Sequence, residues 1–202
     1  MYEAVFFDLD GTLYLKRGMG VRLVCAALSG GRLSADGPLR PLACLRLLAL
    51  ERKVRRALAG HAVGYDALFA GIASRAGMDP DAVRMWYDGW YMPAMVAALQ
   101  KHYTLYEPVV SKARMFKAAG CKIAVLSDYG CVREKIEALG GDPALFDALL
   151  DAPSLGGFKP CPDVFRAACS SLGADPARCA LVGDRRDTDG GCVAVGMTYI
   201  PR

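Results

Sequence analysis

Short apolar runs alternate with amphipathic segments along much of this chain, and the alternation predicts its architecture. Nearly every position is apolar at 4–8 (AVFFD), 122–128 (KIAVLSD), 179–184 (CALVGD) and 196–200 (GMTYI), with a weaker run at 146–152 (FDALLDA). Strands that are apolar on both faces belong to a sheet covered on both sides, which is usually parallel. We therefore expect a buried parallel sheet.

Helical patterns lie between these strands, at 107–120, 129–141 and 161–173. The first of them has Pro108 in its first turn and Gly120 at its end, where these residues favour a helix start and stop. Strands that alternate with helices predict an α/β fold. In such a fold, ligands gather beyond the carboxyl ends of the strands.

Residues 16–104 interrupt this rhythm, because they contain no strand pattern. Helix-like stretches occur at 20–30, 38–60, 64–77 and 79–103, and a polar connection is expected at 29–38 (SGGRLSADGP). We interpret 16–104 as a helical insertion into the α/β core. The core itself is then expected to comprise residues 1–15 and 105–202.

Composition narrows the class of protein. Of 202 residues, 53% are hydrophobic and 23% charged, which is typical of a soluble globular protein with a substantial core. The first ten residues lack the basic start of a secretory signal. The apolar stretch 41–50 is too short to cross a bilayer and carries Arg46. We expect a cytoplasmic protein without a membrane partner.

Cysteine and histidine do not form recognisable metal sites in this sequence. The eight cysteines are scattered, with no C-x-x-C pair, so we expect them to be reduced and mostly to fill the core. His61 and His102 are far apart and have no ligand-like neighbours, so neither is expected to bind zinc.

Positive charge is concentrated in the helical insertion. The net charge of +4 is too small to indicate a nucleic-acid partner. Residues 16–56 nevertheless contain two acids, Asp36 and Glu51, against ten bases: Lys16, Arg17, Arg22, Arg32, Arg40, Arg46, Arg52, Lys53, Arg55 and Arg56. A solvated helix face is the simplest explanation, and attraction of an anionic substrate to a cleft is the alternative.

Acidic and hydroxyl residues follow three of the predicted strands. Asp8 and Asp10 come after the first strand, Ser127 ends the second, and Asp184 ends another. Turn formation alone could explain Asp8 and Asp10, but parallel strands would bring all these groups to one edge. Clustered carboxylates repel unless a cation lies between them, and oxygen ligands without histidine or cysteine favour Mg²⁺.

Such a cluster suits phosphoryl transfer. A carboxylate beside Mg²⁺ can attack phosphorus and form an aspartyl phosphate, and a second carboxylate can move the proton. The phosphoryl oxygens need positive charge and hydrogen-bond donors. Lys159, in the loop 156–160 (GGFKP), and the Ser127 hydroxyl are the candidates for these roles.

Four segments resemble, in order, the four motifs of the haloacid dehalogenase superfamily in its phosphatase branch, which includes phosphoglycolate phosphatase-like proteins. They are 8–13 (DLDGTL), 125–128 (VLSD), 158–165 (FKPCPDVF) and 181–189 (LVGDRRDTD). The resemblance implies a Rossmann-like parallel-sheet core with an all-α cap inserted between the first two motifs. Residues 16–104 lie where that cap would be.

The resemblance also implies roles for individual residues. Asp8 would be the nucleophile and Asp10 the general acid and base. Mg²⁺ would be held by the Asp8 side chain, the Asp10 backbone carbonyl and Asp184. Dehalogenating members lack an acid at the position of Asp10, which argues against carbon–halogen cleavage.

By the same resemblance, Ser127 and Lys159 would hold the phosphoryl group, and Asp189 would orient the water shell of the metal. Asp187 is an extra acid beside this motif, so either Asp187 or Asp189 could support the metal. Asp128 stands where the family more often has Asn or Thr, and we expect it to cap a helix beginning near Tyr129.

The predicted function is Mg²⁺-dependent hydrolysis of a small phosphomonoester through an aspartyl phosphate. The alternatives are a phosphomutase acting on a sugar phosphate, a non-catalytic phosphate-binding protein, and a module whose basic insertion binds nucleic acid. We expect a phosphorylated metabolite as the partner and no nucleic acid. Phosphoglycolate, nucleotide monophosphates and sugar phosphates all remain open as substrates, and no oligomeric state is predicted.

Overall fold

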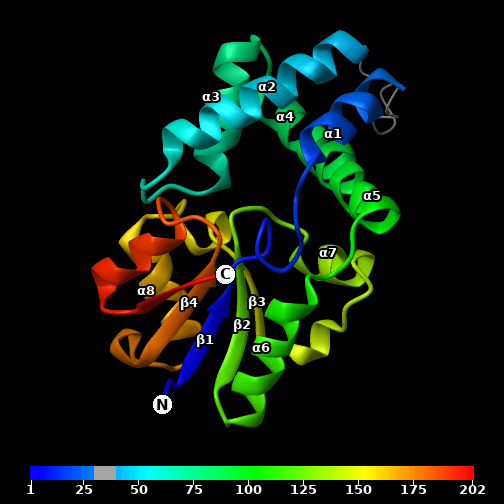
Figure 1. Ribbon diagram of the computed structural model, residues 1–202. Coiled ribbons are helices and arrows are strands. Elements are labelled where there is room, and N and C mark those ends of the chain that lie inside the picture. Colours follow the sequence, from blue (N-terminus) through cyan, green and yellow to red (C-terminus); the bar gives the residue numbers. More distant parts are fainter. Residues whose placement is uncertain (30–39) are drawn as a thin grey trace.

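The computed structural model describes residues 1–29 and 40–202 (Figure 1). Within them, five parallel strands form one sheet in the order β3-β2-β1-β4-β5. These strands are β1 (Ala4–Phe7), β2 (Lys122–Ser127), β3 (Ala148–Asp151), β4 (Cys179–Gly183) and β5 (Thr198–Pro201). The predicted α/β fold with a parallel sheet is confirmed.

The register of the central strand, β1, determines which chain segments meet at one edge of the sheet. All four residues of β1 are fully buried. Phe7, the last of them, is paired with Val125 on one side and with Val182 on the other. The chain segments that leave β1, β2 and β4 therefore emerge side by side at one edge of the sheet.

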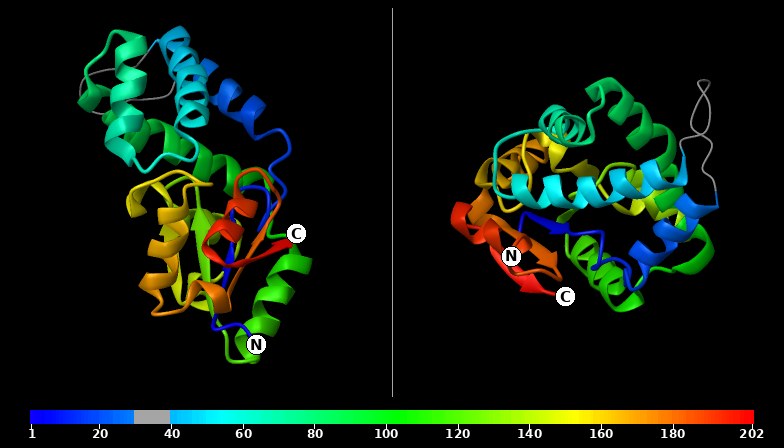
Figure 2. Two further views of the ribbon diagram at one scale, coloured as in Figure 1. Left: turned by 90° about the vertical axis from the view of Figure 1, so that its left-hand side faces the viewer. Right: turned by 90° about the horizontal axis from the view of Figure 1, so that it is seen from above.

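Helices cover both faces of the sheet, as the apolar strands require (Figure 2). Val5 and Phe7 belong to the apolar cluster of α6 (Glu107–Ala118) and α7 (Val132–Ala138). Ala4 and Phe6, which point the other way, pack with α8 (Pro162–Ser171). Alternate residues of one strand thus stabilise two separate layers.

The helical insertion lies beyond the carboxyl edge of the sheet (Figures 1 and 2). Its helices are α1 (Met19–Leu28), α2 (Pro41–Leu58), α3 (Tyr65–Ala76), α4 (Pro80–Trp86) and α5 (Met92–His102), with a π-helical turn, η1 (Tyr87–Tyr91), between the last two. The sequence pattern did not predict this turn. The expected connection at 29–38, with Arg32 and Asp36, falls on residues 30–39 and so lies outside the described residues.

Shorter elements complete the chain. The 3₁₀ helices are η2 (Pro143–Leu145), η3 (Pro153–Leu155), η4 (Pro176–Arg178) and η5 (Asp189–Val195). All eight cysteines are free, and six of them are buried. In the two described ranges, every helix falls short of the length or the apolar character that crossing a membrane requires.

Candidate active site

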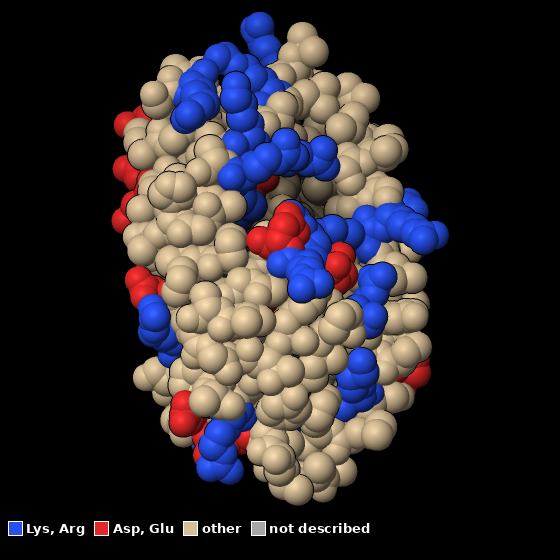
Figure 3. Space-filling view, turned by 60° about the vertical axis from the view of Figure 1, so that its left-hand side comes forward, with Lys and Arg blue, Asp and Glu red and all other residues tan. Residues whose placement is uncertain are grey.

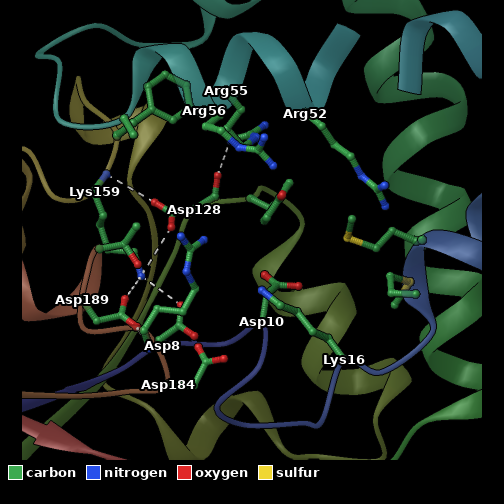
Figure 4. Close-up of a pocket in the computed structure, with 18 of the residues that line it drawn as sticks. Asp8, Asp10, Lys16, Arg52, Arg55, Arg56, Asp128, Lys159, Asp184 and Asp189 are labelled. Carbon is green, nitrogen blue, oxygen red and sulfur yellow. Dashed lines mark hydrogen bonds and ion pairs between the residues drawn. The ribbon is translucent and has the colours of Figure 1, made fainter. Parts of the chain in front are cut away.

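Three carboxylates from distant parts of the sequence meet at the carboxyl edge of the sheet. Asp8 follows β1, Asp184 follows β4 and Asp189 begins η5. One oxygen of each lies within 4.8 Å of the others (Figure 4). The sheet register brings Asp8 and Asp184 to the same edge, and the turn of 185–188 returns Asp189 to it.

Glycines permit this close approach. Gly11 has φ +120°, and a Cβ there would lie 2.4 Å from Oδ2 of Asp184. At Gly183, a Cβ would lie 2.3 Å from Oδ2 of Asp189. A side chain at either position would therefore displace a carboxylate of the cluster.

The Lys159 ammonium lies within this cluster. Its Nζ is 2.9 Å from Asp8 Oδ1 and 2.6 Å from Asp189 Oδ1, and the side chain is fully buried. Asp128 Oδ2 is 3.7 Å from the same nitrogen. Burial alone would lower the pKa of Lys159, but the three carboxylates around it raise it well above its ordinary value. Lys159 is therefore a permanent positive charge at this site.

One ammonium does not neutralise the whole cluster. Burial, reinforced by the charge of Asp8, outweighs Lys159 and raises the pKa of Asp189 to about 6. Burial and Asp8 also raise the pKa of Asp184. The oxygen donors of Asp8, Asp184 and Asp189 thus fit a hard divalent cation such as Mg²⁺, which would relieve their repulsion.

Asp10 has different surroundings from Asp8. It accepts hydrogen bonds from the Tyr14 hydroxyl (2.6 Å) and the Ser127 hydroxyl (2.9 Å), and Lys135 Nζ lies 3.2 Å from its Oδ2. Burial alone would raise the pKa of Asp10, but Lys135 and the hydrogen bond from Tyr14 outweigh it and hold the pKa below its ordinary value. Asp10 is therefore held as a carboxylate in this arrangement.

Sequence reasoning missed Lys135. This residue is fully buried on α7, and its ammonium also lies 5.0 Å from the centre of the Tyr129 ring. A signal was present in the sequence, since Lys135 falls on the same helical stripe as Val132, Ile136 and Leu139. A lysine on an inward-facing stripe needs a buried acidic partner.

The helix that follows β2 begins later than the sequence predicted. The Ser127 hydroxyl is fully buried and donates to Asp10, while Asp128 lines the cavity in front of it. The prediction that Asp128 caps a helix beginning near Tyr129 was wrong. The helix begins three residues later, at Val132, after Cys131 adopts a left-handed conformation with φ 54°.

The two acids of the last motif occupy different places. Asp189 is buried in the cluster, and its Oδ2 accepts a hydrogen bond from the backbone N–H of Arg185 (3.2 Å). Asp187 is exposed and forms an ion pair of 2.5 Å with Arg185, whose hydrogen bond lowers the pKa of Asp187. Of the two, only Asp189 lies close to Asp8 and Asp184.

A cavity of about 500 Å³ separates these residues from the helical insertion. Figure 3 shows lysine and arginine side chains gathered around its mouth. The lining bases are Lys16, Arg52, Arg55, Arg56, Lys159 and Arg185. An apolar wall of Met19, Leu23 and Met95 completes it. This volume suits a small organic ligand.

Arg55 joins the helical insertion to the sheet edge. It forms a buried ion pair of 2.5 Å with Glu51, donates to the backbone carbonyl of Asp128 (2.6 Å), and lies 4.2 Å above the centre of the Tyr129 ring. Sequence reasoning counted Arg55 only as one member of a basic stretch. No local pattern distinguishes it from its neighbours, because its partners lie on another element.

Comparison with known proteins gives the family context. A family profile described as haloacid dehalogenase-like hydrolase matches residues 2–190. The curated N-acylneuraminate-9-phosphatase of Rattus norvegicus is 33% identical over 90 residues, which are 44% of this chain and 36% of that protein. The chain thus spans about a third of that relative.

A second curated relative aligns with nearly the whole chain, but at lower sequence identity. The phosphoglycolate phosphatase of Neisseria meningitidis is 26% identical over 206 aligned residues, covering 98% of this chain and 80% of that protein. Among solved structures, CbbY from Rhodobacter sphaeroides in complex with phosphate superposes with a TM-score of 0.65 at 22% identity, covering 100% of this chain and 86% of that one. The last likeness concerns the fold alone.

Proposed function

Since the chain belongs to the haloacid dehalogenase-like hydrolase family, we propose that it hydrolyses a small phosphomonoester with Mg²⁺ and an aspartyl-phosphate intermediate. The observation that carries this proposal is the position of Asp8, whose carboxylate lies 2.9 Å from Lys159 and within 4.8 Å of Asp184 and Asp189. A nucleophile in these surroundings can approach a phosphoryl group whose negative charge is balanced.

The metal would be held by the side chains of Asp8 and Asp184 and by the backbone carbonyl of Asp10, and Asp189 would orient its water shell. When bound, Mg²⁺ supplies positive charge that offsets the repulsion between the carboxylates and the phosphoryl oxygens. The raised pKa values of Asp184 and Asp189 support this assignment, because these acids lack a full counter-charge in the protein alone.

In the first step, a carboxylate oxygen of Asp8 attacks phosphorus, and the bond from phosphorus to the ester oxygen breaks. Asp10 gives a proton to the departing oxygen, so the product leaves as an alcohol. Lys159 offsets charge on the phosphoryl oxygens, and Ser127, whose hydroxyl also donates to Asp10, would help to hold the phosphoryl group. A phosphate dianion close to Asp10 would favour the protonated form of this acid for the first step.

In the second step, water attacks phosphorus, Asp10 takes a proton from that water, and the bond from phosphorus to Asp8 breaks. Phosphate leaves, and Asp8 is restored as a carboxylate. Lys135 and the Tyr14 hydroxyl stabilise Asp10 in the carboxylate form that accepts the proton. The surroundings of Asp10 therefore suit its role as the base.

We assign the helical insertion, residues 16–104, the role of a cap that excludes bulk water and contacts the rest of the substrate. The cavity between it and the sheet edge supports this role, as does the buried contact from Arg55 to the carbonyl of Asp128. A phosphorylated metabolite of modest size is the partner that the cavity accommodates.

The test is a panel of phosphomonoesters assayed for released phosphate, with Mg²⁺ and with a chelator. The wild-type protein should release phosphate only with the metal, and Asp8→Asn should lose at least 1,000-fold of this activity, in line with removal of a nucleophile. Asp187→Asn, which removes an exposed acid from the same region, should retain it.

Three results would contradict the proposal: unchanged turnover in Asp8→Asn, full activity in chelator, or no turnover of any ester in the panel. A sugar monophosphate converted to its isomer without free phosphate would identify a phosphomutase instead. Tight phosphate binding without turnover would identify a binding protein.

A further inference from the structure

One face of α2 presents arginines to the cavity. Arg52, Arg55 and Arg56 are related by three and four residues, so they share a helical stripe, and all three line the cavity. Lys53, on the same helix, does not line it. The arginines of α2 therefore form part of the cavity wall and not simply a solvated helix face.

The three arginines differ in what they bind. Arg55 is fully engaged by Glu51 and the Asp128 carbonyl. In contrast, the guanidinium groups of Arg52 and Arg56 have no hydrogen-bond or ion-pair partner among residues 1–29 and 40–202. Two guanidinium groups thus line the cavity without forming an ion pair with any acid in the described part of the chain.

Arg52 is exposed and lines the helical side of the cavity. Its Nη2 lies against α1, where a Cβ at Gly20 would be only 2.3 Å away. Figure 4 shows the Arg52 side chain directed into the space across from the carboxylates, whereas the Lys16 nitrogen ends close to Asp10. The absence of a side chain at Gly20 leaves room for this guanidinium beside the apolar wall.

The phosphoryl end of the cavity already has its own positive charge. Lys159 is in contact with Asp8, and Lys135 with Asp10. Arg52 and Arg56 come from the opposite wall, on the helical insertion, so they are available to a different part of the substrate. Guanidinium groups bind carboxylates and phosphates through two parallel hydrogen bonds, which gives them strength and directionality.

We propose that the substrate carries a second anionic group, a carboxylate or a second phosphate, which Arg52 and Arg56 bind while the first phosphate lies at Asp8. This inference rests on the proposed phosphatase function and narrows its substrate to phosphomonoesters with two separated anionic groups.

Matched pairs of esters test the inference. Carboxymethyl phosphate is compared with 2-hydroxyethyl phosphate, and propane-1,3-diol bisphosphate with the corresponding monophosphate. The wild-type protein should prefer the member with the extra anion by at least about ten-fold in kcat/KM in one pair, and that pair identifies a carboxylate or a phosphate. The Arg52→Gln/Arg56→Gln variant should reduce this preference to about two-fold or less.

Lys53→Gln is the matched control, since it removes one positive charge from α2 outside the cavity and should retain the preference. Binding of the same four esters to Asp8→Asn, measured by calorimetry with and without the two arginine substitutions, reports the same preference without turnover. Equal preference with and without Arg52 and Arg56, or none in the wild type, would overturn the inference. Hydrolysis of the two esters that lack the second anionic group would leave the proposed function intact.

Discussion

Lys135 Nζ lies 3.2 Å from Asp10 Oδ2 in the interior of the protein, although 125 positions separate the two residues in the chain. Their side chains are 0% and 7% exposed. The Lys135 ammonium is withdrawn from water and the Asp10 carboxylate nearly so, and the pairing therefore stabilises both charges. The pair joins α7 to the turn that follows β1.

Lys135→Met is expected to lower the free energy of unfolding by about 3 kcal/mol, because it leaves the Asp10 carboxylate buried without its cation. Urea denaturation measures this loss. The Lys135→Met/Asp10→Asn variant should lose less than the sum of the two single variants, since the second change removes the unpaired charge. Strict additivity would show that the two side chains do not interact.

A second prediction concerns Arg55 and Glu51. Arg55→Met should destabilise the protein by about 3 kcal/mol, because Glu51 is fully buried and would lose its partner. Arg56→Met, one position along the same helix and exposed, should change the free energy of unfolding by about 0.5 kcal/mol or less. Replacing both members of the pair, in Glu51→Leu/Arg55→Met, should recover part of the loss.

These three variants separate a specific ion pair from general loss of charge on α2. Equal destabilisation by Arg55→Met and Arg56→Met would refute the prediction. So would a loss of stability in Glu51→Leu/Arg55→Met equal to the sum of the losses in the two single variants, Glu51→Leu and Arg55→Met.

Gly11 gives a prediction about the geometry of the cluster. Gly11→Ala must strain a backbone at φ +120° and place a methyl group against Asp184. We expect a loss of stability of about 1–2 kcal/mol and Mg²⁺ binding at least about ten-fold weaker, measured by calorimetry. The control is Gly89→Ala, where a Cβ meets no atom within 4 Å. Metal binding as strong in Gly11→Ala as in the wild type would contradict this prediction.

Mg²⁺ is expected to stabilise the protein in a pH-dependent way. The pKa of Asp189 is raised from 3.8 to about 6, so the folded state binds more protons than the unfolded state between these values. In chelator, the free energy of unfolding should therefore decrease as pH rises from about 4 to 6, through the contribution of this group.

Because Mg²⁺ binds ionised carboxylates, the increase in Tm that it produces should be small at pH 5 and larger at pH 7. Thermal unfolding at the two pH values, with metal and with chelator, measures this difference. Asp184→Asn should abolish most of the increase, whereas Asp187→Asn should preserve it. An increase of equal size at both pH values would be inconsistent with metal binding by these acids.

Local sequence pattern was sufficient to predict the parallel sheet, its helical layers and the position of Asp8 and Asp184 at strand ends. Such features are encoded locally, because a strand that is apolar on both faces can only lie inside a covered sheet. Helix ends were predicted less well. The stretch 129–141 yields a helix only at Val132–Ala138, since Cys131 and Gly140 adopt positive φ.

The tertiary structure alone decided which side chains meet. Lys135 pairs with Asp10, the Ser127 hydroxyl turns toward the same carboxylate, and Arg52 and Arg56 face the cavity while Lys53 does not. These relationships depend on how α7 packs on the sheet and how α2 lies across its edge, and a one-dimensional pattern does not specify packing between distant segments. The sequence therefore determined which chemical groups are present and on which elements, whereas three-dimensional packing determined their partners.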